Sequence, residues 1–171
     1  MNQFLRSIFV SLIVMIIAFD IQAQDKTRTL PDVDVKDLTG KMVKSSSLLN
    51  TNGLTIIDFW ATWCKPCILE LDNISDQYPR WQKETGVKII AISIDDARNA
   101  AKVAPFVKGR DWTYEVYIDE NSDFKRALNV GNIPHTFLLN KQGEIIWQHN
   151  SYASGDEDEL YELIKKEAAK K

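Results

Sequence analysis

The feature that most constrains the fold is an alternation of short apolar runs with segments whose apolar residues recur every three or four positions. Residues 54–59 (LTIIDF) form a short apolar run that predicts a buried central strand. From Cys64 onward the spacing becomes helical, and residues 87–94 (VKIIAISI) predict the next strand. Strands that alternate with helices indicate an α/β fold with a largely parallel sheet covered on both faces.

The remaining elements continue this alternation. We expect the helix that starts at Cys64 to kink or end at Pro79. The other predicted elements are an entry hairpin (33–37 and 41–44), a helix (95–109), a strand (114–118), a short helix (122–128) and a closing antiparallel hairpin (136–140 and 144–149). A final helix starts with four acidic residues (156–159) and ends in lysines, which matches the helix dipole.

The first residues have the pattern of a targeting segment. Arg6 supplies a positive charge, and residues 8–19 are an uncharged apolar run of twelve residues. A bilayer core needs about 20 helical residues, so this run is short for a membrane span. We therefore predict a signal peptide at 1–23, cleaved after Ala23, one domain at 24–171, and export to the periplasm or the outer face of the cytoplasmic membrane. An uncleaved segment that anchors the chain in the membrane stays open.

Composition excludes several classes of protein. The chain has 21 Lys and Arg against 24 Asp and Glu and no long basic stripe, so nucleic acid is not an expected partner. Hydrophobic residues make up 44% and charged residues 26%, as in globular domains rather than disordered chains. The two histidines, His135 and His149, lie far from both cysteines without the spacing of a structural zinc site, so no metal is expected.

The two cysteines lie in the tetrapeptide Cys64-Lys65-Pro66-Cys67. A disulfide across so small a ring would stabilise the fold by only about 2 kcal/mol in the chain-entropy model. At a helix N-terminus, in contrast, the dipole stabilises a thiolate at Cys64, and Lys65 adds a nearby positive charge. Cys67, one helical turn away, would then act on a mixed disulfide at high effective concentration. These arguments favour a redox-active pair over an inert bridge.

The surrounding sequence resembles a known family. Residues 57–67 (IDFWATWCKPC) resemble the active-site stretch of thioredoxins, and Ile133-Pro134 resembles their cis-proline loop. Over residues 30–169 the resemblance is closest to exported TlpA/ResA-type thiol-disulfide oxidoreductases, which share the entry hairpin and a helix-strand insertion, here about 95–118. It implies a thioredoxin-like fold with a central mixed sheet flanked by helices. It also implies Cys64 as the nucleophile, Cys67 as the resolving thiol of a redox-active disulfide, and a cis peptide bond before Pro134.

Two carboxylates are candidates for handling the proton of Cys67. Asp58 lies in an apolar strand, where burial should raise its pKa, and it matches the buried acid of thioredoxins. Glu70 matches the acid of the CXXCXXE pattern in the TlpA/ResA group. Ala91 stands where thioredoxins carry a lysine. Which acid acts stays open, as do a hydrogen-bonded structural role for Asp58 and a solvated helix position for Glu70.

Aromatic residues and prolines are expected to frame the sulfur pair. Trp60, Trp63 and Pro134 would form an apolar platform for the backbone of a partner, with core packing as the alternative for Trp60. The proposed framing set is Trp63, Lys65, Pro66, Ile133 and Pro134. His135 is interpreted as a packed or solvated residue rather than a catalyst.

The resulting hypothesis is an exported oxidoreductase that reduces protein disulfides. It would act on disulfide-containing exported proteins, an apocytochrome among the candidates, and be re-reduced by a membrane thiol-disulfide electron donor without any cofactor. A disulfide oxidant, a peroxiredoxin-like peroxidase and a catalytically idle binding module are the alternatives. A peroxidase is disfavoured because neither cysteine follows the proline-and-threonine pattern that activates peroxide. The position three residues upstream is Ala61 for Cys64 and Cys64 for Cys67.

Overall fold

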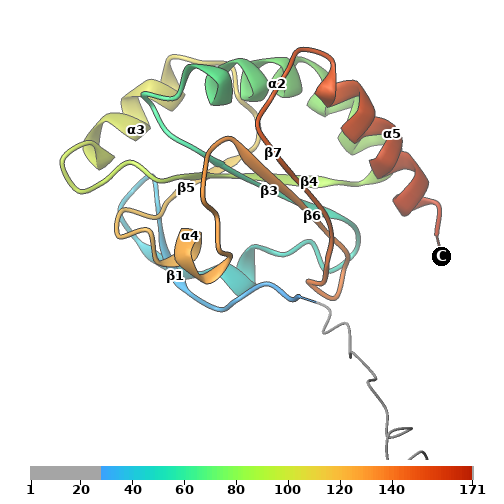
Figure 1. The fold of residues 1–171 in the computed structure, drawn as a ribbon, viewed down its shortest axis with the longest axis horizontal. Helices are drawn as coiled ribbons and strands as arrows, with labels where there is room; N and C mark the ends of the chain where they lie inside the picture. Colours follow the sequence, from blue (N-terminus) through green and yellow to red (C-terminus); the bar gives the residue numbers. More distant parts are fainter. Residues whose placement is uncertain (1–27, 171) are drawn as a thin grey trace, which may run out of the picture.

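The computed structural model describes residues 28–170, so the predicted signal peptide at 1–23 lies outside the described residues. Figure 1 shows a central sheet with helices on both faces. The elements are β1 (Asp34–Asp37), β2 (Met42–Lys44), the 3-10 helix η1 (Ser45–Leu48), β3 (Thr55–Trp60), α2 (Lys65–Thr85), β4 (Lys88–Ser93), α3 (Ala100–Lys108), β5 (Glu115–Ile118), α4 (Asp123–Ala127), β6 (His135–Leu139), β7 (Ile145–Asn150) and α5 (Asp156–Ala168). Within this part of the chain no helix is long and apolar enough to cross a bilayer.

The seven strands form one mixed sheet in the order β2-β1-β5-β4-β3-β6-β7. Only the central pairings, β3 with β4 and β4 with β5, are parallel; the other four are antiparallel. The expectation of a largely parallel sheet is therefore wrong, whereas the mixed sheet that the family resemblance implies is confirmed. Tight turns join only antiparallel neighbours, which accounts for β1 with β2 and β6 with β7. The pairings of β1 with β5 and of β3 with β6 are antiparallel contacts between segments far apart in the chain, which local sequence patterns do not indicate.

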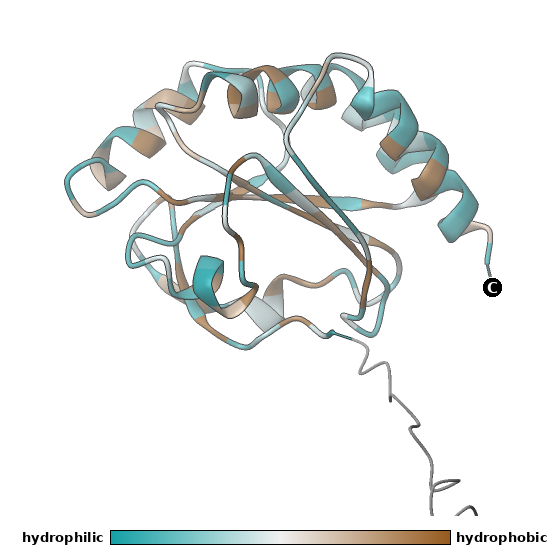
Figure 2. Cartoon of the chain, viewed as in Figure 1, coloured by the Kyte–Doolittle hydropathy of each residue, from teal (hydrophilic) through white to brown (hydrophobic). Residues whose placement is uncertain are grey.

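The two faces of the sheet carry separate hydrophobic clusters. Because side chains alternate along a strand, Ile56 and Trp60 of β3 pack with α2, while Ile57 and Phe59 pack on the opposite face with Phe124 of α4. In Figure 1, α2, α3 and α5 cover one face and α4 the other. Figure 2 shows apolar residues along the central strands and a mostly polar α5. By the same alternation along β3, the side chain of Asp58 lies on the face of the sheet that packs against α2.

The long helix α2 does not end at Pro79, where the sequence analysis expected either a kink or the end of the helix. It continues to Thr85 and is capped by Gly86, whose backbone (φ 70°) donates to the Gln82 carbonyl. Pro79 has no N–H to donate to the Ser75 carbonyl. Pro79 is exposed and Ser75 is only half-buried, so solvent can hydrogen-bond to that carbonyl instead. On the inner face Trp81 is fully buried and stacks on Tyr161 of α5, with ring centroids 5.2 Å apart. Packing on this face outweighs the local cost of proline.

Helix α3 begins five residues later than predicted. The sequence indicated a helix from Asp95, but α3 starts at Ala100. Asp95 is buried with its carboxylate occupied by hydrogen bonds, and the Asp96 carbonyl accepts from the N–H groups of Asn99 and Ala100. The chain therefore makes a separate turn before the helix.

Candidate active site

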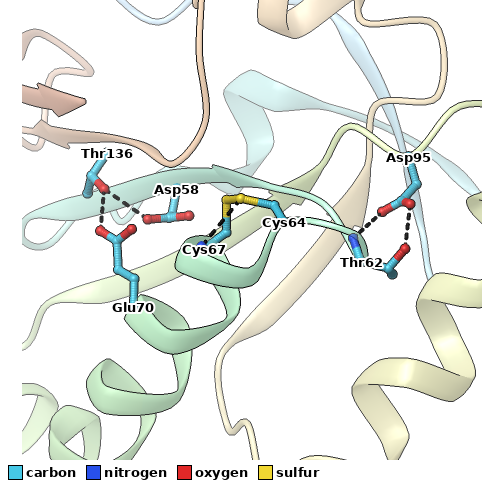
Figure 3. Close-up of a disulfide and its surroundings, with 7 residues drawn as sticks. All are labelled: Asp58, Thr62, Cys64, Cys67, Glu70, Asp95 and Thr136. Carbon is cyan, nitrogen blue, oxygen red and sulfur yellow. Dashed lines mark hydrogen bonds between the residues drawn. A yellow bond between two sulfur atoms is a disulfide. The ribbon is translucent and has the colours of Figure 1, made fainter. Parts of the chain in front are cut away.

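The cysteine pair lies where β3 passes into α2. Cys64 is the N-cap of α2, and its Sγ accepts a hydrogen bond from the Cys67 N–H at 3.4 Å. The two cysteines form a disulfide with Cα atoms 5.3 Å apart, shown in Figure 3. The first turn of α2 contains no acidic residue that would offset the positive end of the helix dipole at the Cys64 sulfur. This arrangement stabilises a thiolate at Cys64.

The two sulfur-bearing residues differ in access to solvent. Cys64 retains 6% of its surface, while Cys67 is completely buried. Lys65 and Pro66, between them, are exposed, and Trp63 directly before Cys64 is 62% exposed. A substrate can therefore reach the pair only from the side of Cys64.

A pair of buried carboxyls lies beside this helix turn. Asp58 is fully buried, and Glu70, one turn after Cys67, is 5% exposed. The hydroxyl oxygen of Thr136 lies 2.9 Å from Asp58 Oδ2 and 2.9 Å from Glu70 Oε1. Figure 3 shows both carboxyls directed toward this one hydroxyl. The alternative of a solvated Glu70 is thus wrong, because the inner face of α2 carries the residue into the core.

Burial dominates the electrostatics of this pair. Desolvation raises the pKa of Asp58 and of Glu70, and the nearby Asp58 charge raises the pKa of Glu70 further. Hydrogen bonding by Thr136 acts in the opposite direction on both groups. Ala91 is the register partner of Asp58 on β4, and no ion pair within residues 28–170 includes Asp58. The pair therefore retains a proton at a pH where ordinary carboxyls are ionised.

The proline loop has the conformation that the resemblance implies. The Ile133–Pro134 peptide bond is cis, and Ile133 packs against the cluster that contains both cysteines. Strand β6 starts directly afterwards, with His135 in register with Phe59. His135 is buried and stacks on Phe137 at 4.5 Å, on the face opposite Thr136, and its burial lowers its pKa. The interpretation of His135 as a packed residue agrees with this environment.

Of the two tryptophans expected to frame the sulfurs, only Trp63 lies at the surface. Trp60 is fully buried and makes an edge-on contact with Trp112, with ring centroids 5.0 Å apart. Trp60 therefore belongs to the core, the alternative recognised for it from the sequence. The roles of Trp63, Lys65, Pro66, Ile133 and Pro134 in holding a substrate remain predictions.

Two residues of the site were missed by the sequence analysis. Thr136 looks like an ordinary strand residue until β6 is paired with β3. Asp95 follows the end of β4, and its carboxylate accepts hydrogen bonds from the Thr62 N–H (2.8 Å), the Thr62 hydroxyl (2.6 Å) and the Ser93 hydroxyl (2.8 Å). It fixes the loop that leads into Cys64. Asp95 could have been identified from the sequence as a polar residue just after a buried strand. The ends of β3 and β4 meet at the same edge of the sheet, where the loop that leads into Cys64 lies.

We predict that Asp95→Ala destabilises the domain by about 2 kcal/mol, because it leaves the half-buried donors of Thr62 and the buried hydroxyl of Ser93 without an acceptor. Urea unfolding measures this loss, and amide hydrogen exchange should show faster exchange at the Thr62 N–H. Asp111→Ala, which removes an exposed aspartate, is the matched control. Unchanged protection of the Thr62 amide would show that Asp95 does not fix the loop.

A helix-capping CXXC disulfide that follows a buried strand, together with a cis-proline at the start of a neighbouring antiparallel strand, defines a thioredoxin-like protein. The AhpC/TSA family model matches residues 27–148, and the chain belongs to this family.

Individual relatives agree with this classification. The chain is 36% identical over 116 residues to the thiol-disulfide oxidoreductase ResA of Bacillus cereus, across 68% of this chain and 64% of that protein, just under two thirds of its length. An uncharacterized thioredoxin-like protein from Porphyromonas gingivalis superposes with a TM-score of 0.73 at 45% identity, over 81% of this chain and 91% of that one. StoA from Bacillus subtilis gives a TM-score of 0.63 at 25% identity, over 78% and 96%. The family and fold predicted from the sequence are confirmed.

Proposed function

We propose that this chain is an exported thiol-disulfide oxidoreductase that reduces protein disulfides through Cys64 and Cys67. The observation that carries the proposal is the disulfide at the N-terminus of α2, in which Cys64 retains a small accessible surface and Cys67 has none. In the reduced protein the Cys64 thiolate attacks a substrate disulfide and releases the first substrate thiolate, which takes a proton from water. Relatives named thiol-disulfide oxidoreductase support the same chemistry.

The second step is resolution of the mixed disulfide. Cys67 loses its proton, attacks the Cys64 sulfur and expels the second substrate thiolate, so the substrate gains two electrons and the enzyme disulfide is formed. The carboxyls of Asp58 and Glu70 would accept the Cys67 proton. Their burial and their shared contact with Thr136 support this role.

The cellular setting follows from the sequence pattern. The apolar run at 8–19 supports export to the periplasm or the outer face of the cytoplasmic membrane. The substrates would be exported proteins with disulfides, and a membrane thiol-disulfide electron donor would regenerate the dithiol. Neither step requires a cofactor.

Equilibration of the purified protein with glutathione buffers tests the direction of the reaction. A reductant should give a potential near that of thioredoxin, about −270 mV. A value near about −120 mV, as in a strong oxidant, would reverse the assignment to disulfide formation. The fraction of oxidised protein is measured by alkylation of the remaining thiols and mass spectrometry.

Two further measurements separate the other candidate functions. Oxidation of the reduced protein by hydrogen peroxide, followed by stopped flow, should be slow, and rapid oxidation would indicate a peroxidase. Alkylation at pH 6 should be fast at Cys64, because a thiolate persists there. Slow alkylation would indicate an idle binding module.

A further inference from the structure

One hydroxyl connects the two buried carboxyls. Thr136 is the register partner of Asp58 across β3 and β6, and α2 brings Glu70 to the same oxygen. The remaining oxygens of the pair, Asp58 Oδ1 and Glu70 Oε2, have no hydrogen-bond partner among the described residues. The Thr136 hydroxyl is thus a partner that both carboxyls share, and the two side chains are also close enough to hydrogen-bond to each other when one of them is protonated.

The number of protons constrains this arrangement. A hydroxyl has one hydrogen and can donate it to only one carboxylate. The second contact of 2.9 Å is a hydrogen bond only if the other carboxyl is protonated and donates to the hydroxyl oxygen. The geometry thus fits a pair that carries one proton and one negative charge.

We infer that Thr136 is a positioning residue whose hydroxyl joins Asp58 and Glu70 into a single proton acceptor for Cys67. The inference rests on the proposed function. In the monoanionic pair Thr136 donates to the carboxylate and accepts from the carboxylic acid. When Cys67 transfers its proton, the pair becomes doubly protonated and neutral, and the Cys67 thiolate attacks the Cys64 sulfur. The pair later returns the proton to solvent or to the reduced Cys67.

The surroundings contain little that could replace this hydroxyl. The titratable groups that interact electrostatically with the pair are Tyr114 before β5, Tyr152 after β7 and Asp156 on α5. His149, the register partner of Thr136 on β7, is half exposed and lies 3.5 Å from Asp156. No lysine or arginine within residues 28–170 forms an ion pair with either carboxyl.

Thr136→Val tests the inference because valine keeps the shape of threonine but loses the hydroxyl. Without a donor, the monoanion of the pair is less stable, so its first ionisation should move to higher pH by about one unit. Thr136→Ser keeps the hydroxyl and should stay within about 0.3 unit of the wild type. The midpoint is measured by carbon NMR of the labelled Asp58 and Glu70 carboxyls in all three proteins.

The rate of the resolving step gives a second readout. This rate should rise with pH as the pair ionises, and Thr136→Val should shift the midpoint upward by the same amount. Below both midpoints the variant should be slower by about tenfold, and Thr136→Ser should restore the rate. Reduction of insulin by the fully reduced protein, quenched at set times, provides the measurement.

The outcomes separate this inference from the proposed function. An unchanged carboxyl midpoint in Thr136→Val would overturn the inference and leave Thr136 a structural residue, even if the variant is less stable. A wild-type protein that exchanges no disulfide at any pH would overturn the proposed function, while the NMR titration would still decide whether Thr136 joins the carboxyls. Should the valine variant not fold, Thr136→Ala with the same NMR titration takes its place.

Discussion

Replacement of Cys64 by serine is expected to lower the rate of insulin reduction by at least about a thousandfold. A serine hydroxyl is not ionised near neutral pH, so the variant lacks the nucleophile that starts the exchange. Cys67 cannot substitute for it because it has no exposed surface. The assay measures insulin reduction with dithiothreitol as the electron source, corrected for the rate without protein.

The matched variant Cys67→Ser separates attack from resolution. It keeps the reachable nucleophile but should stop at the mixed disulfide with insulin, seen as a covalent adduct on a non-reducing gel and released by dithiothreitol. Cys64→Ser should give no adduct. If Cys64→Ser formed adducts as readily as Cys67→Ser, the assignment of the attacking sulfur would be wrong.

Replacing both buried acids should make the protein more stable at alkaline pH. The folded-state pKa values of Asp58 and Glu70 are raised above their unfolded values, so the protein releases these protons less readily when folded. Their contribution to stability is full below the unfolded pKa values of about 4 and is lost as pH rises through the raised folded values. The double variant Asp58→Asn, Glu70→Gln removes this loss. At pH 9 it should exceed the wild type by about 3 kcal/mol in free energy of unfolding, relative to their difference at pH 4.

Urea unfolding at both pH values provides the measurement. The control is Asp76→Asn with Asp111→Asn, which removes the same charge from exposed positions and should leave the pH dependence of the wild type intact. A double variant that loses stability between pH 4 and pH 9 as steeply as the wild type would show that the two carboxyls are not titrating in the core.

The sequence predicted correctly those features that depend on residues close together in the chain. The CXXC spacing, the apolar strand before it and the helical repeat after it predicted the junction of β3 and α2, because each depends on residues close in the chain. Asp58 could be singled out because a carboxylate inside an apolar strand stands out. The cis peptide bond before Pro134 came from family resemblance rather than from local physics.

The parts that sequence could not provide depend on pairing between distant segments. Thr136 becomes part of the site only when β6 lies antiparallel beside β3, which fixes its contact with Asp58. The burial of Glu70 depends on the rotation of α2 against the sheet. Pro79 misled the local argument because tertiary packing of Trp81 determines how far the helix extends.

The unequal access of the two sulfurs has a consequence for selectivity among thiols. Because Cys67 is completely buried, the proposed function would link every client to Cys64 and never to Cys67. Release of the client by Cys67 would then be unimolecular, so the rate of that step would not depend on the protein concentration. Under the proposed function, a protein present at low concentration would complete each turnover once its client is captured.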